Sequence, residues 1–127
     1  MSIRIVRLGS PRAANEGLRL GTVRRPPRGV KKEKLASDDW YDLWLPQLAP
    51  SAELVKEALA ATTDAEWQRF TRKYEAEMST PDNARLLAVL AALSRDANFA
   101  VGCYCENEER CHRSILRRLF VEAGATL

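Results

Sequence analysis

Four segments of the chain carry the hydrophobic patterns of β-strands. In the first segment Ile3 and Ile5 share one face, and in the third large rings alternate with polar residues, so that Trp40 and Trp44 share a face. The last segment is a nearly continuous apolar run, which is typical of the most buried strand of a sheet. The predicted strands are Ser2–Leu8, Leu18–Val23, Asp39–Leu45 and Asn98–Cys105.

Apolar residues at helical spacing, together with capping residues, predict four helices. The first begins after Ser51, and the second begins after Thr63, which forms a capping box with Glu66. A third begins at Thr80, and the last ends before Gly124. The core-facing stripes of the last three helices are Trp67, Phe70, Tyr74 and Met78; Leu86, Leu87, Leu90 and Leu93; and Ile115, Leu116, Leu119 and Phe120.

This order of elements predicts one compact α/β domain over residues 1–127. We expect a small, mostly parallel sheet flanked by helices in a Rossmann-like layered arrangement. With 127 residues, of which 46% are hydrophobic and 29% charged, the chain has the size and composition of one ordinary domain. No apolar run approaches the roughly 20 residues that span a bilayer, and the first residues lack the apolar core of a secretory signal. We therefore expect no membrane association and a cytoplasmic, bacterial-type location.

Positive charge is concentrated in the first third of the chain. Residues 1–35 hold ten Lys and Arg against two Glu, whereas residues 36–127 hold ten against fifteen Asp and Glu. A basic segment of this kind favours an anionic partner, such as a phosphate, a nucleotide or nucleic acid. Alternatively, the two regions neutralise each other across the surface, because charge runs are usually solvated faces. The cations of the stiff loop around Pro26-Pro27 are Arg24, Arg25 and Arg28.

The residues best suited to chemistry lie between Cys103 and Arg113. This stretch contains all three cysteines and the single histidine of the chain. Cys103 and Cys105 are separated by one residue on the predicted strand, so both sulfur atoms point to the same face. Cys111, His112 and Arg113 stand where the last helix begins, and free N–H groups at a helix start favour anions and thiolates.

Three interpretations of this cluster stay open. In the first, Cys111 and His112 form a reactive pair and need no cofactor. In the second, Cys103, Cys105, Cys111 and His112 bind zinc, although structural zinc sites usually separate paired cysteines by two residues. In the third, Cys103 and Cys105 are small buried hydrophobic residues, as free cysteines often are. The residues that would bind the anion in the first interpretation are Arg24, Arg25, Arg28, Arg113 and Ser114.

Three blocks of the chain resemble the YeaO-like family, a set of small bacterial and archaeal proteins with a domain of unknown function. The blocks are RLGTVRRPPRGVKKEKLA, DWYDLWLPQLAPSAELVKEAL and CYCENEERCHRSILRRL. The resemblance implies an α/β domain with a pocket between the arginine loop and the Cys-His-Arg turn, and it supplies no substrate. A common form of the family has tryptophan before proline–arginine–glycine, where Pro26 stands here, and some members lack the Cys and Arg beside the histidine. Arg28 and His112 are therefore the best-supported site residues.

Two classes of function follow from these observations. As an enzyme, the protein would act on a phosphorylated or nucleotide-like small molecule, with His112 as acid/base, Cys111 as nucleophile or orienting group, and arginines stabilising charge. As a binding module, its basic first third would contact nucleic-acid phosphates with salt-sensitive affinity. We rank the enzyme first, because no recognition helix, zinc-finger spacing or RNA-binding signature is present. The sequence does not predict the oligomeric state.

Overall fold

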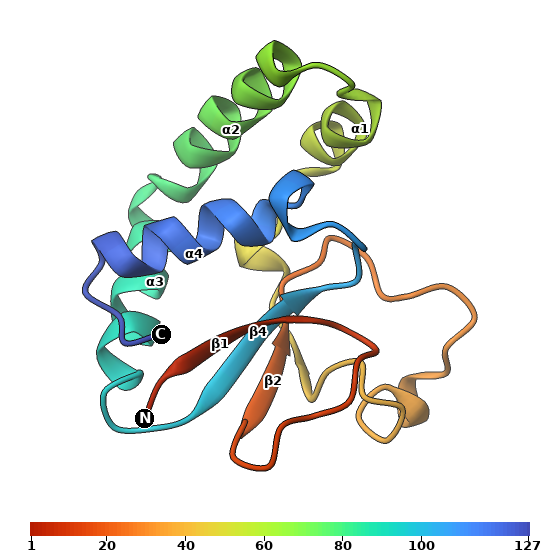
Figure 1. Cartoon of the computed structure of the whole chain (residues 1–127), viewed down its shortest axis with the longest axis vertical. Coiled ribbons are helices and arrows are strands. Elements are labelled where there is room, and N and C mark those ends of the chain that lie inside the picture. Colours follow the sequence, from red (N-terminus) through yellow and green to blue (C-terminus); the bar gives the residue numbers. More distant parts are fainter.

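The sheet has four parallel strands in the order β1-β4-β2-β3 (Figure 1). The structure is a computed structural model that describes residues 1–127. The strands are β1 (Ile3–Arg7), β2 (Leu18–Gly21), β3 (Leu43–Trp44) and β4 (Phe99–Cys103). Every residue of β4 is buried, as the apolar run predicts, because the strand lies between β1 and β2. The prediction of an α/β fold with a small parallel sheet is confirmed.

Four α-helices and three short 3-10 helices complete the fold. Ser51 and Thr63 cap their helices as predicted, because their side chains accept hydrogen bonds from the backbone N–H groups of Leu54 and Glu66. None of the helices combines the length and the apolar character that a bilayer crossing requires. The helices are α1 (Ala52–Ala60), α2 (Asp64–Met78), α3 (Pro81–Leu93) and α4 (His112–Glu122), with η1 (Lys32–Lys34), η2 (Pro46–Leu48) and η3 (Glu108–Arg110).

The main hydrophobic core lies between the helices and one face of the sheet. The predicted stripe of α2 enters this core through Phe70, Tyr74 and Met78, and the buried face of α4 does so through Ile115 and its neighbours. Burial of large apolar side chains of this kind contributes roughly 1.5–3 kcal/mol each. The core residues are Ile3, Leu48, Leu54, Phe70, Tyr74, Met78, Leu87, Phe99, Val101, Ile115, Leu116 and Phe120.

Loops around residues 9–17 and 36–42 cover the other face of the sheet. Arg19 on β2 is fully buried there and donates hydrogen bonds to both carboxylate oxygens of Glu16. The ring of Tyr41 packs directly over Gly21, where an added Cβ would lie 2.4 Å from a ring carbon. Only glycine therefore permits this close approach.

The prediction of a strand over Asp39–Leu45 is only partly right. Regular strand structure is confined to Leu43–Trp44, and Asp39 has a left-handed backbone with φ 62°. The chain turns at Asp39 so that the Tyr41 ring can cover Gly21, and this turn interrupts the alternating pattern. The Trp40 ring packs against Gly9, where an added Cβ would lie 3.3 Å from it, whereas the indole N–H of Trp44 donates to the Val23 carbonyl.

Candidate functional site

The parallel pairing of β2 with β4 brings the arginine loop beside the cysteine-rich turn. Gly21 pairs with Gly102, so both strands end at the same edge of the sheet. Just beyond, the backbone N–H and the hydroxyl of Thr22 both donate to the Gly102 carbonyl at 3.0 Å. Ligands gather at the carboxyl ends of strands in open α/β sheets, and this edge is where the chemistry-bearing residues meet.

A cavity of about 440 Å³ opens at this edge. Its floor contains the three thiols and the imidazole, one wall is apolar, and several cations surround it. The loop 24–28 and the turn 103–112 contribute to the same cavity, although about eighty positions separate them in the sequence. The lining residues include Arg24, Arg25, Arg28, Val55, Lys56, Leu59, Phe70, Cys103, Tyr104, Cys105, Arg110, Cys111 and His112.

The His112 ring is fixed by contacts of both nitrogen atoms. Nε2 lies 2.6 Å from the carbonyl oxygen of Thr22, and because a carbonyl only accepts, Nε2 carries the proton of this hydrogen bond. Nδ1 then faces the Cys111 sulfur at 3.7 Å. The ring of Tyr74 stands edge-on to the imidazole, with centroids 5.6 Å apart, and the histidine is only 7% exposed. His112 is therefore oriented toward the Cys111 thiol.

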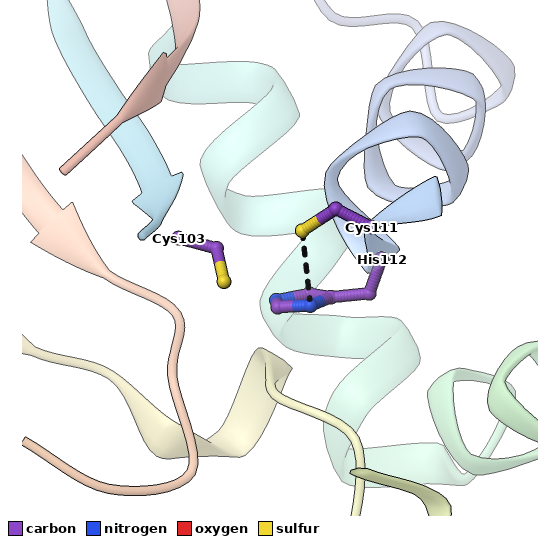
Figure 2. A group of neighbouring side chains, drawn as sticks. All are labelled: Cys103, Cys111 and His112. Atoms are coloured by element: carbon purple, nitrogen blue, oxygen red, sulfur yellow. Dashed lines mark hydrogen bonds between the residues drawn. The ribbon is translucent and has the colours of Figure 1, made fainter. Parts of the chain in front are cut away.

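The three thiols gather around one point at the end of β4. The sulfur atoms of Cys103 and Cys105 are 3.5 Å apart, which confirms that they point to the same side of the chain. The sulfur atoms of Cys103 and Cys111 and a ring nitrogen of His112 lie within 4.8 Å of one another (Figure 2). Cys103 and Cys111 are buried and Cys105 is half-buried, and all three cysteines are free thiols.

Interactions among the three thiols lower the pKa of Cys111 and raise those of the other two. Interactions with the neighbouring thiols of Cys103 and Cys105, helped by His112, hold the pKa of Cys111 well below its ordinary value despite burial. Contacts with the other two thiols, followed by burial, raise the pKa of Cys103. For Cys105, the contact with Cys103 lowers the pKa, but Cys111 and burial outweigh it and raise the pKa. Cys111 also precedes the first turn of α4, where the helix dipole stabilises an anion.

The three arginines of the early loop differ in what their side chains do. Arg24 donates to the carbonyl oxygens of Pro46, Ala49 and Pro50 at 2.9 to 3.2 Å, so its donors hold the η2 segment in place. Arg25 and Arg28 are exposed at the cavity, and neither forms an ion pair with an acidic residue. Arg25 and Arg28 are thus the loop cations available to a ligand.

Arg113 and Ser114 belong to the predicted set but do not line the cavity. Arg113 is 3% exposed, and its Nη2 donates to the Cys105 carbonyl at 2.6 Å. Its Nε is buried without a hydrogen-bond partner, and no Asp or Glu pairs with its charge. The Ser114 hydroxyl donates to the Cys111 carbonyl at 2.9 Å. Both side chains therefore support the turn from behind rather than contacting the cavity.

Three polar residues of the cavity were not among the predicted site residues. Arg110 lines the cavity, pairs with Asp64 and lies 5.8 Å from the Trp67 ring centre. Tyr104 lines it beside the arginine loop, and its hydroxyl donates to the Arg25 carbonyl at 3.1 Å. Lys56 reaches the cavity from α1. The position of Arg110 inside the cysteine-rich turn is a sequence signal that could have identified it, whereas nothing in the sequence distinguishes Lys56 from other helix lysines.

Cys103, Cys111 and His112 are also the residues that could hold a metal ion. Thiolate and imidazole ligands suit zinc. A histidine that donates one N–H to a backbone carbonyl and presents its other nitrogen is oriented as metal-binding histidines usually are. Cys105 is available as a fourth donor, because its sulfur lies 3.5 Å from that of Cys103. The donor set thus fits the zinc alternative as well as the reactive pair.

Comparison with known proteins gives one match. A family model described as the active DUF488-N3 subclade matches residues 3–124. No curated protein and no solved structure matches the chain. The matched range includes both the arginine loop and the cysteine-rich turn.

Proposed function

The chain belongs to the DUF488 family, which is defined by a domain of unknown function, and we propose that it is a cysteine-dependent enzyme acting on an anionic small molecule. Its reactive group is the Cys111 thiolate, assisted by His112. Its substrate occupies the cavity, where Arg25 and Arg28 bind a phosphate or a similar anionic group. The matching family model describes an active subclade, which is consistent with an enzymatic role, and the resemblance to the YeaO-like family is consistent with the same domain.

The orientation of the His112 ring carries this proposal. Nε2–H is held by the Thr22 carbonyl at 2.6 Å, so Nδ1 either accepts the Cys111 proton or, once protonated, donates to the thiolate at 3.7 Å. A nucleophile beside a base that a third group orients is the arrangement by which thiols are activated. The same imidazole can return the proton to a leaving group as the reaction ends.

The surroundings of the thiolate favour an anionic substrate of nucleotide-like character. Arg25, Arg28, Lys56 and Arg110 supply positive charge around the cavity, whereas Cys111 lies at its floor. Arginine binds phosphate through paired hydrogen bonds, and such cations stabilise charge that develops during group transfer. The apolar side chains of Val55, Leu59 and Phe70 offer contact for a planar or apolar part of the same molecule.

Alkylation of the reduced protein by iodoacetamide at neutral pH tests this proposal. We expect one thiol, Cys111, to react at least about tenfold faster than a free cysteine, because its thiolate is stabilised. Inorganic phosphate or a nucleoside monophosphate should slow this reaction by occupying the cavity, and the slowing should be weaker in R28Q. The labelled residue is identified by mass spectrometry of the peptide.

Matched variants and a zinc measurement separate a reactive Cys111 from ordinary thiols and from a zinc site. C111S should lose the fast reaction, whereas S114A should retain it, because the Ser114 hydroxyl only contacts the Cys111 carbonyl. Three equally slow thiols would contradict the proposal. The zinc content of the same preparation is measured in parallel, and one equivalent of zinc with blocked thiols would favour the metal site instead.

Nucleic-acid binding is the second candidate function. The cations of the cavity continue along the exposed loop into Lys31, Lys32 and Lys34. Such a surface would bind phosphates with an affinity that falls steeply with salt. Binding of a short oligonucleotide that persists in C111S but weakens in a Lys31/Lys32/Lys34 triple glutamine variant would favour it. The three free thiols are consistent with a reducing cytoplasm as the place of action for either function.

A further inference from the structure

Cys103 and Cys111 face each other at the floor of the cavity (Figure 2). Cys103 ends β4 and Cys111 immediately precedes α4, so two regular elements hold their backbones. Their sulfur atoms and a ring nitrogen of His112 lie within 4.8 Å of one another. A disulfide needs sulfur atoms about 2.05 Å apart, so a shift of less than about 3 Å would join them.

From this arrangement we infer that Cys103 and Cys111 form a two-electron redox site, which a hydroperoxide converts into an intramolecular disulfide. Because it uses the nucleophilic thiolate of Cys111, this site rests on the proposed function and adds to it a partner thiol and an oxidant. Both cysteines line the cavity, so a molecule as small as hydrogen peroxide can reach the sulfur atoms together. Formation of the bond removes the nucleophile and switches the thiol chemistry off until a reductant restores it.

The chemistry balances with hydrogen peroxide as the oxidant. The Cys111 thiolate attacks one peroxide oxygen; the S–O bond forms, the O–O bond breaks, and the departing hydroxide takes the Nδ1 proton of His112 to become water. Cys111 is then a sulfenic acid. The Cys103 thiol gives its proton to Nδ1 and attacks the Cys111 sulfur; the S–S bond forms and the S–O bond breaks. The departing hydroxide takes that proton and leaves as a second water. Two thiols are oxidised and one peroxide is reduced.

Geometry favours Cys103 over Cys105 as the partner thiol. The Cys105 sulfur also neighbours Cys111, but it lies outside the group of atoms within 4.8 Å of one another, so Cys103 alone is placed beside both the Cys111 sulfur and a ring nitrogen of His112. A disulfide between Cys103 and Cys105 is also disfavoured. Their sulfur atoms lie 3.5 Å apart, but only one residue separates them at the end of a strand. Cα atoms two residues apart on an extended chain are about 6.6 Å apart, near the upper limit for a disulfide. Cys111 approaches Cys103 from a separate element and has no such restriction.

The experiment treats the reduced full-length protein with equimolar hydrogen peroxide at neutral pH. We expect the intact mass to fall by two hydrogen atoms, the free thiols to fall from three to one, and dithiothreitol to reverse both changes. Peptide mapping without reductant should show residue 103 joined to residue 111. Three surviving thiols, a bond that includes Cys105, or a bond only between two molecules would overturn the inference.

Serine variants of the two candidate partners make the test specific. C105S should still form the disulfide, whereas C103S should instead accumulate Cys111 sulfenic acid, which dimedone traps. Circular dichroism checks that both variants fold. If C103S does not fold, the peptide map of the oxidised wild-type protein still decides which two cysteines are joined. Fast alkylation of Cys111 without disulfide formation would remove the redox site and leave the proposed function intact. Slow alkylation of Cys111 would remove the proposed function itself.

Discussion

Two buried arginines differ in how the protein compensates their charge. Arg19, on the loop-covered face of the sheet, is fully buried and donates to both Glu16 carboxylate oxygens and to the carbonyls of Ser10 and Asp39. Arg113, at the start of α4, is almost as buried, yet it makes one hydrogen bond, to the Cys105 carbonyl, and its Nε has no partner. The first site is electrostatically complete within the fold, and the second is not.

The difference separates a structural charge from a charge that remains for chemistry. A buried cation requires a counter-charge, and for Arg19 Glu16 provides it at 2.7 Å. No carboxylate pairs with Arg113, and its positive charge lies beside the Cys105 thiol, where it opposes the rise in pKa that Cys111 and burial cause. The charge of Arg113 therefore lies beside the cysteine cluster without a carboxylate of its own.

The largest expected effect is the loss of stability when Arg19, the arginine with a carboxylate partner, is replaced. R19M leaves the Glu16 carboxylate buried without its partner, so we expect the free energy of unfolding to fall by about 3–5 kcal/mol. Chemical denaturation followed by circular dichroism measures this change. R12M is the matched control, because Arg12 forms part-exposed ion pairs with Asp39 and Asp42. We expect this variant to lower the free energy of unfolding by about 1 kcal/mol or less. Equal losses of stability in the two variants would show that the buried Arg19 network contributes no more than the part-exposed ion pairs of Arg12.

How far the sequence predicts the fold depends on how local each signal is. The caps at Ser51 and Thr63, the apolar run of β4 and the stripe of α2 are local patterns, and each formed the predicted element. The Asp39–Leu45 segment has an equally clear alternation but forms only two residues of strand. Its conformation depends on a distant glycine, Gly21, against which Tyr41 packs, and such a contact cannot be read from alternation.

The residues of the candidate site could be predicted better at its centre than at its edge. Cys111 and His112 were identified because rare, reactive residues gather in one turn, and Arg28 because it stands in a stiff basic loop. Arg24 and Arg113 look equivalent to Arg28 in the sequence. Their donors, however, go to backbone carbonyls, and only the three-dimensional arrangement of η2 and of the Cys105 turn determines this.

A smaller effect is expected for H112Q. Glutamine can still donate to the Thr22 carbonyl but offers no second nitrogen to Cys111, so the rate of alkylation at neutral pH should fall by about tenfold or more. Rates of iodoacetamide reaction, followed by mass spectrometry, measure the change. H112F is the companion variant, because it removes both contacts. An unchanged rate in H112Q would mean that Cys111 owes its reactivity to the other thiols alone.

R113M tests the comparison directly. Because Arg113 lacks a carboxylate partner and has an orphan Nε, its loss should cost less than about 1.5 kcal/mol of unfolding free energy, in contrast to R19M. The loss of a nearby positive charge should slow alkylation of the cluster by a few-fold. R113K keeps the charge and should keep most of the rate. A stability loss as large as that of R19M would erase the distinction between the two arginines.

The pH dependence of alkylation should show the smallest change. A free thiol loses thiolate about tenfold per unit below its pKa, so its reaction slows steeply between about pH 8 and pH 6. Interactions with Cys103 and Cys105 lower the pKa of Cys111, and a lowered pKa keeps the thiolate present as the pH falls through this range. The rate for Cys111 should therefore vary less than about threefold, whereas the unfolded protein in urea should follow the steep profile. A steep profile in the folded protein would mean that Cys111 is an ordinary thiol, and that the cluster beside Arg113 carries no thiolate at neutral pH.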